Sequence, residues 1–257
     1  MRLYVPMLML AAACTTPVQA TGGQTVFQGS ATEVDGRSYP FQLLLPSRMS
    51  EARMPLVVFL HGAGERGTDN TRQLTWLPLG MAGEPMRSQF PCYLLAVQCP
   101  ADETWVDVPW AATVSSPLPA EPSRALRAVM AALDRVLAEH PVDPDRVYLT
   151  GLSMGGYGAF DLAMRMPGRF AAMVPVCGGG DPASVERLRG LPTWIWHGAA
   201  DKVVPAVRSR QMAEAMQSAG MDVRHEELAG VGHDSWRQAY GAEGAIGWMF
   251  AQRRTAD

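Results

Sequence analysis

The segment around Ser153 constrains the fold of this chain more than any other feature. An apolar run at residues 147–149 leads into Gly-Leu-Ser-Met-Gly at residues 151–155. A strand that ends in Gly-x-Ser-x-Gly and continues as a helix turns so sharply that the positions flanking the serine must lack bulky side chains. Residues 154–166 read as that helix. The pattern predicts a strand–turn–helix unit that presents the Ser153 hydroxyl as a nucleophile.

A nucleophilic serine needs a histidine as its base, and the chain contains five histidines. Four of them end apolar runs, close a predicted helix or lie in an alternating polar segment: His61, His140, His197 and His225. His233 instead stands in the glycine-flanked loop at residues 230–236, after the last predicted strand. In folds built around a Gly-x-Ser-x-Gly turn, the histidine base lies in a loop near the end of the chain. We therefore predict His233 as the base.

The acid that orients the base is expected between the nucleophile and the base in the chain. Asp201 is the leading candidate, because it lies in the loop that follows the apolar run at residues 191–197. Asp181 also follows a strand-like run and is the alternative. Aspartate before proline is, however, a common turn residue, which gives Asp181 a purely structural explanation.

Two backbone N–H groups are expected to bind the oxyanion that forms during attack on a carbonyl. One belongs to Met154, the residue after the nucleophile. The other lies in the glycine-rich loop after the apolar run at residues 56–60, at Ala63 or Gly64, which the sequence does not distinguish.

Alternation over residues 25–30 and 39–45, around an Asp-Gly pair, predicts an N-terminal antiparallel pair of strands. Six further strand-like runs alternate with helical stretches, near residues 56–61, 93–99, 146–151, 171–176, 191–197 and 222–228. The clearest helical stretch spans residues 123–139. This order predicts an α/β fold with a mostly parallel central sheet and helices on both faces. The loops at the carboxyl ends of the strands, which carry all three predicted catalytic residues, would then converge.

Residues 1–20 predict an export signal, with a basic start and an apolar run at residues 3–13. Two processing sites are open: one before Cys14, which would then be lipidated, and one after Ala20. We therefore expect a periplasmic, secreted or outer-membrane-anchored protein with a single catalytic domain at residues 21–257. Lipidated Cys14 would be its membrane attachment.

Composition excludes several classes of function. A net charge of −3 provides no basic footprint for nucleic acid, and 47% hydrophobic residues are typical of a globular chain. No cluster of cysteine and histidine has zinc spacing, and catalysis by serine needs no metal or organic cofactor.

In the loop at residues 100–120, Trp105 and Trp110 either line the substrate pocket or pack the loop onto the sheet. The oligomeric state is not indicated.

Four motifs together resemble a known family. They are His-Gly-x-Gly-Glu-Arg-Gly at residues 61–67, Gly-Leu-Ser-Met-Gly-Gly-Tyr-Gly at 151–158, Trp-x-x-His-Gly-x-x-Asp-x-x-Val-Pro at 194–205 and Gly-x-Gly-His-Asp-x-Trp at 230–236. Over about residues 24–253 the chain resembles secreted bacterial α/β-hydrolases of the predicted-peptidase or prolyl-oligopeptidase-like group, close to phospholipase/carboxylesterase and dienelactone-hydrolase-type esterases. The resemblance implies an α/β-hydrolase fold and places the nucleophile on Ser153, the acid on Asp201 and the base on His233.

Three functions follow from these observations. The leading one is a serine esterase that cleaves small or polymer-linked carboxylic esters through an acyl-enzyme on Ser153. A serine peptidase is the alternative that the family label suggests. The third is a non-catalytic envelope binding protein, against which the intact set of serine, aspartate and histidine argues.

Overall fold

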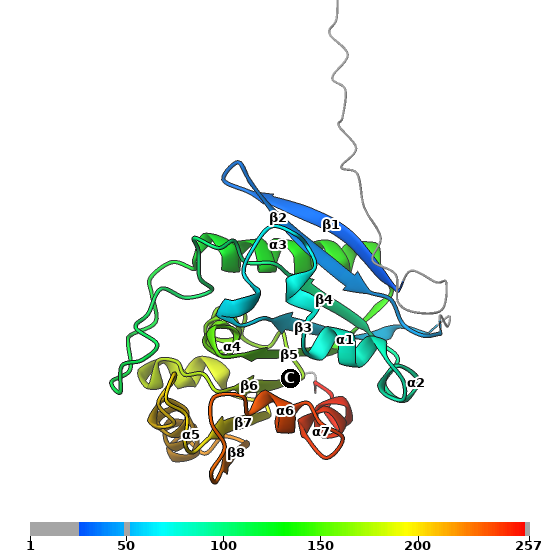
Figure 1. The fold of residues 1–257 in the computed structure, drawn as a ribbon. Helices are drawn as coiled ribbons and strands as arrows, with labels where there is room; N and C mark the ends of the chain where they lie inside the picture. The colour runs from blue at the N-terminus through cyan, green and yellow to red at the C-terminus, as the bar shows by residue number, and fades with distance from the viewer. Residues whose placement is uncertain (1–25, 49–51, 255–257) are drawn as a thin grey trace, which may run out of the picture.

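The computed structural model describes residues 26–48 and 52–254, and within them an eight-stranded sheet has the order β1-β2-β4-β3-β5-β6-β7-β8 (Figure 1). β1 pairs with β2, and β2 with β4, in antiparallel orientation, while all other neighbours are parallel. This confirms the predicted sheet. The strands are β1 (Phe27–Val34), β2 (Arg37–Leu44), β3 (Met54–Leu60), β4 (Tyr93–Val97), β5 (Val142–Leu152), β6 (Ala172–Val176), β7 (Thr193–Gly198) and β8 (Val223–Leu228).

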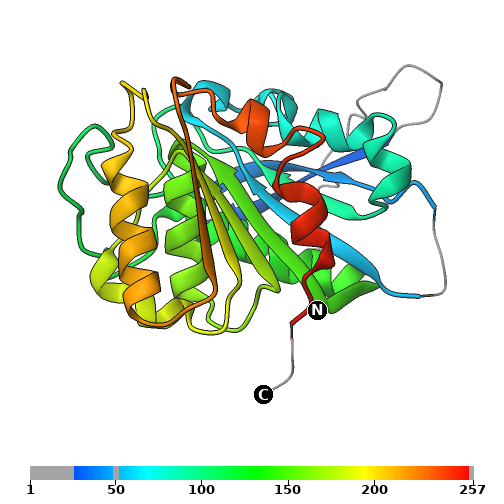
Figure 2. The ribbon, with the colours of Figure 1, turned by 90° about the horizontal axis from the view of Figure 1, so that it is seen from below.

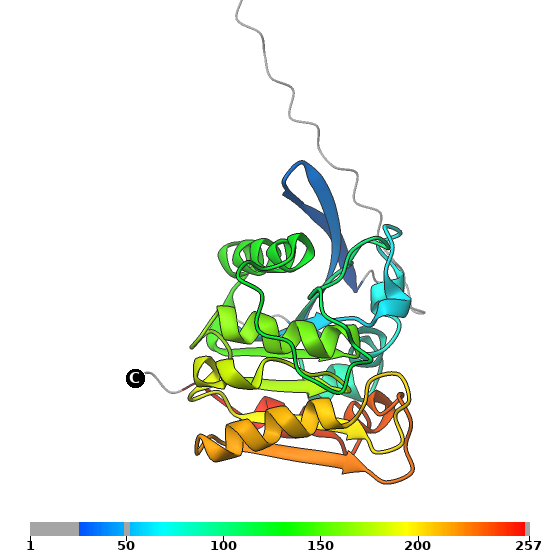
Figure 3. The ribbon, with the colours of Figure 1, turned by 90° about the vertical axis from the view of Figure 1, so that its left-hand side faces the viewer.

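Two layers of helices cover the sheet, as predicted. One layer contains α3 (Arg124–Glu139), α4 (Met154–Arg165) and α5 (Val207–Ser218), which lie in a row in Figure 3. The other face carries α1 (Leu77–Ala82), α6 (Trp236–Ala239) and α7 (Ala245–Ala251), with α2 (Met86–Gln89) beside α1 (Figure 2). Short 3₁₀ segments connect these elements: η1 (Ala63–Glu65), η2 (Arg72–Leu74) and η3 (Pro182–Leu188).

The sequence explains most of these elements locally. β3 and β4 are apolar and buried at every position, as parallel strands covered on both faces must be. α3 begins after Ser123, whose hydroxyl oxygen accepts from the Leu126 N–H at 3.0 Å, and its apolar stripe faces the sheet. β5 begins at Val142, four residues before its predicted start at residue 146, because Val142 pairs with Met54 upstream of Pro144.

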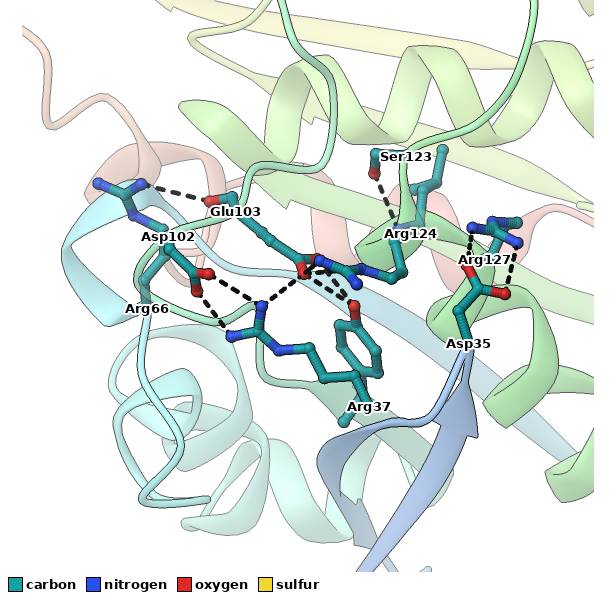
Figure 4. A network of polar contacts seen from close by, with 10 residues as sticks. Asp35, Arg37, Arg66, Asp102, Glu103, Ser123, Arg124 and Arg127 are labelled. Atoms are coloured by element: carbon teal, nitrogen blue, oxygen red, sulfur yellow. Dashed lines mark hydrogen bonds and ion pairs between the residues drawn. The ribbon is translucent and has the colours of Figure 1, made fainter.

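One half-buried carboxylate ties the N-terminal hairpin to the rest of the fold (Figure 4). The Glu103 carboxylate accepts from Arg37 at 2.8 Å, from the Tyr39 hydroxyl at 2.9 Å and from Arg124 at 2.8 Å. Its backbone carbonyl accepts from Arg66, in the loop after β3, at 3.3 Å. The hairpin, the start of α3 and the loop that carries Ala63 and Gly64 therefore meet at a single residue.

The predicted export segment, with Cys14 and Ala20, lies outside the described residues. None of the helices in the described part of the chain has both the length and the hydropathy needed to cross a bilayer.

Candidate active site

Ser153 occupies the turn between β5 and α4 in a strained conformation. Its backbone has φ 54° and ψ −119°. Residues other than glycine rarely adopt this conformation, which costs of order 1–3 kcal/mol. The neighbouring glycines are sterically required: a Cβ at Gly155 would lie 1.9 Å from the Leu60 carbonyl oxygen, and one at Gly151 would lie 2.3 Å from the Gly155 carbonyl oxygen. The predicted strand–turn–helix unit is therefore present, with Ser153 at its tip.

The three predicted catalytic residues lie in one chain of hydrogen bonds. Ser153 follows β5, Asp201 follows β7 and His233 follows β8, so all three stand at the carboxyl edge of the sheet. His233 Nε2 is 2.9 Å from Ser153 Oγ, and His233 Nδ1 is 2.7 Å from Asp201 Oδ2. An ionised carboxylate can only accept, so Nδ1 carries the proton and Nε2 of the neutral ring can accept from the serine hydroxyl.

The carboxylate of Asp201 is fully buried and surrounded by donors. Oδ1 accepts from the N–H groups of Val203 at 2.8 Å and Val204 at 3.0 Å, while Oδ2 faces His233 and, at 3.2 Å, Nε2 of His197. Burial alone would raise the pKa of Asp201, but the hydrogen bonds from the two histidines and the two amides outweigh it and hold the pKa well below its usual range. Asp201 is therefore ionised at neutral pH.

Asp181, the alternative acid, stabilises a turn at the start of η3 instead. It stands at the N-cap of η3, where its side chain accepts from the Ala183 N–H at 3.1 Å and from the Ser184 hydroxyl at 2.6 Å. It also accepts from the Leu118 N–H at 2.9 Å and so holds the loop at residues 100–120.

The loop after β3 lies against the Ser153 turn. A Cβ at Gly62 would be 2.7 Å from Leu152 Cδ1, which shows how closely the two segments approach. Arg66 donates from Nε to the Ala63 carbonyl at 3.0 Å and thereby fixes the orientation of the loop backbone. Within the described part of the chain, the N–H groups of Ala63, Gly64 and Met154 donate to no other residue, so they are available to a ligand.

Trp105 does not line a pocket, which corrects one of the two predictions for the loop at residues 100–120. It is completely buried, its Nε1 donates to the His61 carbonyl at 2.9 Å, and its ring packs edge-on against the His61 ring at 5.1 Å. The packing alternative therefore holds for Trp105. Trp110 is half-buried, and its carbonyl accepts from the Tyr157 hydroxyl, in α4, at 3.2 Å.

The structure contains a groove next to His233 that was not predicted from the sequence. It is open, measures about 280 Å³, and is lined by Thr75, Trp76, Leu77, Gly80, Met86, Trp236, Arg237 and Tyr240. It runs between α1 and α6, which are neighbours in Figures 1 and 2.

The groove contacts both the predicted base and the predicted oxyanion loop. The Trp236 ring stands edge-on to His233 at 5.3 Å and packs against Trp76 at 5.4 Å, while Trp76 Nε1 donates to Glu65 at 3.1 Å. Trp236 follows His233 by three residues, close to one helical turn, which is a signal that could have revealed it. Trp76 carries no comparable signal.

One cluster near the site has the composition of a metal site. Ligand atoms of Cys177, Asp201 and His233 lie within 4.8 Å of one another. Cys177 is a buried free thiol, and burial raises its pKa well above the usual range, which makes the thiolate that a metal needs hard to form. Asp201 and His233 are already hydrogen-bonded to each other, so the cluster is better explained as part of the chain of hydrogen bonds to Ser153, with a thiol beside it.

Known proteins resemble this chain in sequence and fold. The family model described as "Esterase PHB depolymerase" matches residues 38–180, which is more than half of the chain. A solved thermostable esterase is 35% identical and has a TM-score of 0.80, with 89% of this chain and 64% of that chain covered. An acylaminoacyl peptidase of Pyrococcus horikoshii is 13% identical with a TM-score of 0.64, over 90% of this chain and 43% of that one, and shows the fold alone.

Among curated proteins, poly(3-hydroxyalkanoate) depolymerase C of Paucimonas lemoignei is 43% identical over 47 residues, which are 18% of this chain and 11% of the relative. The chain thus spans less than two thirds of the length of these relatives. The predicted resemblance to esterases and oligopeptidase-like hydrolases is confirmed: the chain has the α/β-hydrolase fold and belongs to the esterase PHB depolymerase family.

Proposed function

We propose that this protein is a carboxylic-ester hydrolase with Ser153 as nucleophile, His233 as base and Asp201 as acid. The observation that carries the proposal is the pair of hydrogen bonds that joins Asp201 to His233 at 2.7 Å and His233 to Ser153 at 2.9 Å. Membership of an esterase family supports an ester rather than an amide as the substrate.

The proposed reaction has two steps. In the first, His233 Nε2 takes the Ser153 proton while Oγ attacks the ester carbonyl, and the resulting imidazolium gives this proton to the departing alcohol. An acyl-enzyme remains on Ser153. In the second, water attacks the acyl-enzyme with His233 again as the base, and the carboxylic acid leaves. Asp201 holds the imidazole in the required tautomer and stabilises its charge.

We assign the oxyanion to the N–H groups of Met154 and of Ala63 or Gly64. All three donors are unused by other described residues, and they flank the serine in the two segments that pack together. One such donor contributes on the order of 3–4 kcal/mol to stabilisation of the transition state.

The substrate class is a small or polymer-linked ester with an apolar portion, which the groove between α1 and α6 would bind. Its aromatic wall at Trp76 and Trp236 suits an aliphatic or hydroxyacyl chain next to the reacting carbonyl. The name of the depolymerase relative is consistent with a polymeric aliphatic ester. Trp110, whose carbonyl accepts from the Tyr157 hydroxyl of α4, is a further candidate contact.

Export and a single catalytic domain at residues 21–257 are also part of the proposal. They rest on the signal-like pattern of residues 1–20, with processing at Cys14 or Ala20.

The direct test is hydrolysis of p-nitrophenyl acetate, butyrate and palmitate by the chain that lacks residues 1–20. We expect turnover that Ser153→Ala abolishes and that Ser218→Ala, an exposed serine at the end of α5, leaves intact. Equal slow rates in the unsubstituted protein and Ser153→Ala would refute the mechanism. Faster cleavage of acyl-peptide p-nitroanilides than of these esters would favour the peptidase alternative.

A further inference from the structure

A second histidine lies on the carboxylate of Asp201. His197 ends β7 and is completely buried. Its Nε2 lies 3.2 Å from Asp201 Oδ2, the oxygen that also accepts from His233, and 3.0 Å from the Val204 carbonyl oxygen. Its Nδ1 lies 2.6 Å from Ser209 Oγ, in α5. No step of the proposed mechanism uses this ring.

The hydrogen-bonding partners of the His197 ring indicate which of its two nitrogens carry a proton. Ser209 has one hydroxyl hydrogen, and its Oγ is 2.9 Å from the Gly178 carbonyl oxygen, which can only accept. The Ser209 hydroxyl therefore donates to Gly178 and accepts from Nδ1–H of His197. Nε2 of His197 faces a carboxylate and a carbonyl, which are also acceptors only. Both ring nitrogens must then carry hydrogen.

We propose that His197 is a buried imidazolium that forms an ion pair with Asp201 and acts as a positioning residue for it. A neutral ring would require the Ser209 hydroxyl to donate to Nδ1 instead. The buried Gly178 carbonyl would then lose the hydrogen bond that Ser209 gives it, at a cost of order 1–3 kcal/mol. The ion pair also compensates the charge of the Asp201 carboxylate, which has no exposure to solvent.

Several donors surround the carboxylate. Oδ1 accepts from two amides and Oδ2 from His233 Nδ1, with His197 Nε2 3.2 Å from Oδ2, so Asp201 cannot rotate without breaking several hydrogen bonds. Other ionisable groups lie on the elements packed around His197. Glu227 lies opposite His197 on β8 and is paired with Arg210 at 2.6 Å. β8 also carries Arg224, His225 and Glu226, α5 also carries Arg208 and Glu214, and the Cys177 thiol follows β6.

The positive charge of His197 has a consequence for the base. It partly offsets the negative charge of Asp201 at the His233 ring. Replacing His197 by neutral glutamine, which keeps a donor for Asp201, should move the acid-side midpoint of the kcat/KM profile upward by about one pH unit. This part rests on the proposed function.

The deciding experiment is two-bond ¹H–¹⁵N NMR of the histidine rings in ¹⁵N-histidine-labelled protein, with His197→Gln and Ser209→Ala to assign the signals. It needs no catalytic activity, so it separates failure of this proposal from failure of the proposed esterase function. We expect His197 to show two protonated nitrogens at neutral pH. A His197 ring with a single protonated nitrogen at neutral pH overturns the proposal.

Kinetics then test the positioning role. His197→Gln should raise the acid-side midpoint, and His140→Gln, the same substitution at the end of α3, should not move it. An unmoved midpoint in His197→Gln contradicts the assigned role.

Discussion

Replacing Asp201 with asparagine tests the arrangement of the triad most directly. The carboxylate accepts at Oδ1 from two amides and at Oδ2 from His233 Nδ1, while His197 Nε2 lies 3.2 Å from Oδ2. The asparagine oxygen can still satisfy the amides of Val203 and Val204, which leaves the NH₂ group facing His233. That group donates, so His233 Nδ1 must become an acceptor and the ring proton must move to Nε2. Nε2 then can no longer take the proton of Ser153.

The expected loss follows from this change of tautomer. A base in the wrong tautomer costs about 10⁴-fold in kcat, or roughly 5.5 kcal/mol of transition-state stabilisation. The assay is kcat on p-nitrophenyl butyrate, with thermal unfolding as a check on the fold. Asp181→Asn is the matched control, because it makes the same change at the alternative acid. Retention of more than a tenth of kcat by a folded Asp201→Asn protein would contradict the proposed role of Asp201, as would a larger loss in Asp181→Asn.

Three further predictions follow from the same contacts. Trp76→Ala should lower kcat/KM for p-nitrophenyl butyrate about tenfold more than for acetate, since it removes one aromatic wall of the groove; equal losses for both esters would argue against binding there. The depressed pKa of Asp201 should make the folded state more stable above the ordinary aspartate range, and this contribution should be lost as pH falls below about 3.8 toward the lower folded-state pKa. Urea unfolding across that range should show a weaker pH dependence in Asp201→Asn than in the unsubstituted protein. Gly155→Ala should abolish activity or folding, because its Cβ would lie 1.9 Å from the Leu60 carbonyl oxygen; an active, folded Gly155→Ala would show that the two segments can separate.

The elements that were predicted well are those with local signals. The turn at Ser153 depends on small residues at fixed offsets, and the strands depend on apolar runs of ordinary length. The start of β5 was predicted late, because Pro144 resembles a strand boundary when its neighbours in the sheet are unknown. The choice of Asp201 over Asp181 could be ranked from the chain order, but the two carboxylates are distinguished by their partners in space.

Aromatic residues near the site were the least predictable. Trp105 and Trp76 are both tryptophans in long connections after strands, and nothing in their neighbouring residues separates them. Trp105 is buried because its indole finds the His61 carbonyl beneath the loop. Trp76 reaches the groove because α1 packs beside α6, which follows β8 at the far end of the chain.

Local patterns in the chain were enough to predict the α/β order, the sharp turn at Ser153 and the candidate base, since each prediction depends on residues close together in the chain. Contacts between distant segments are needed to show that Trp76 borders the site, that Trp105 does not, and that His197 lies against the carboxylate of Asp201. These contacts join β7, β8, α1, α5 and α6, and their existence depends on strand order and on helix packing. A pattern along the chain specifies backbone conformation, whereas the partner of a buried donor is specified only when the elements that carry donor and acceptor pack together.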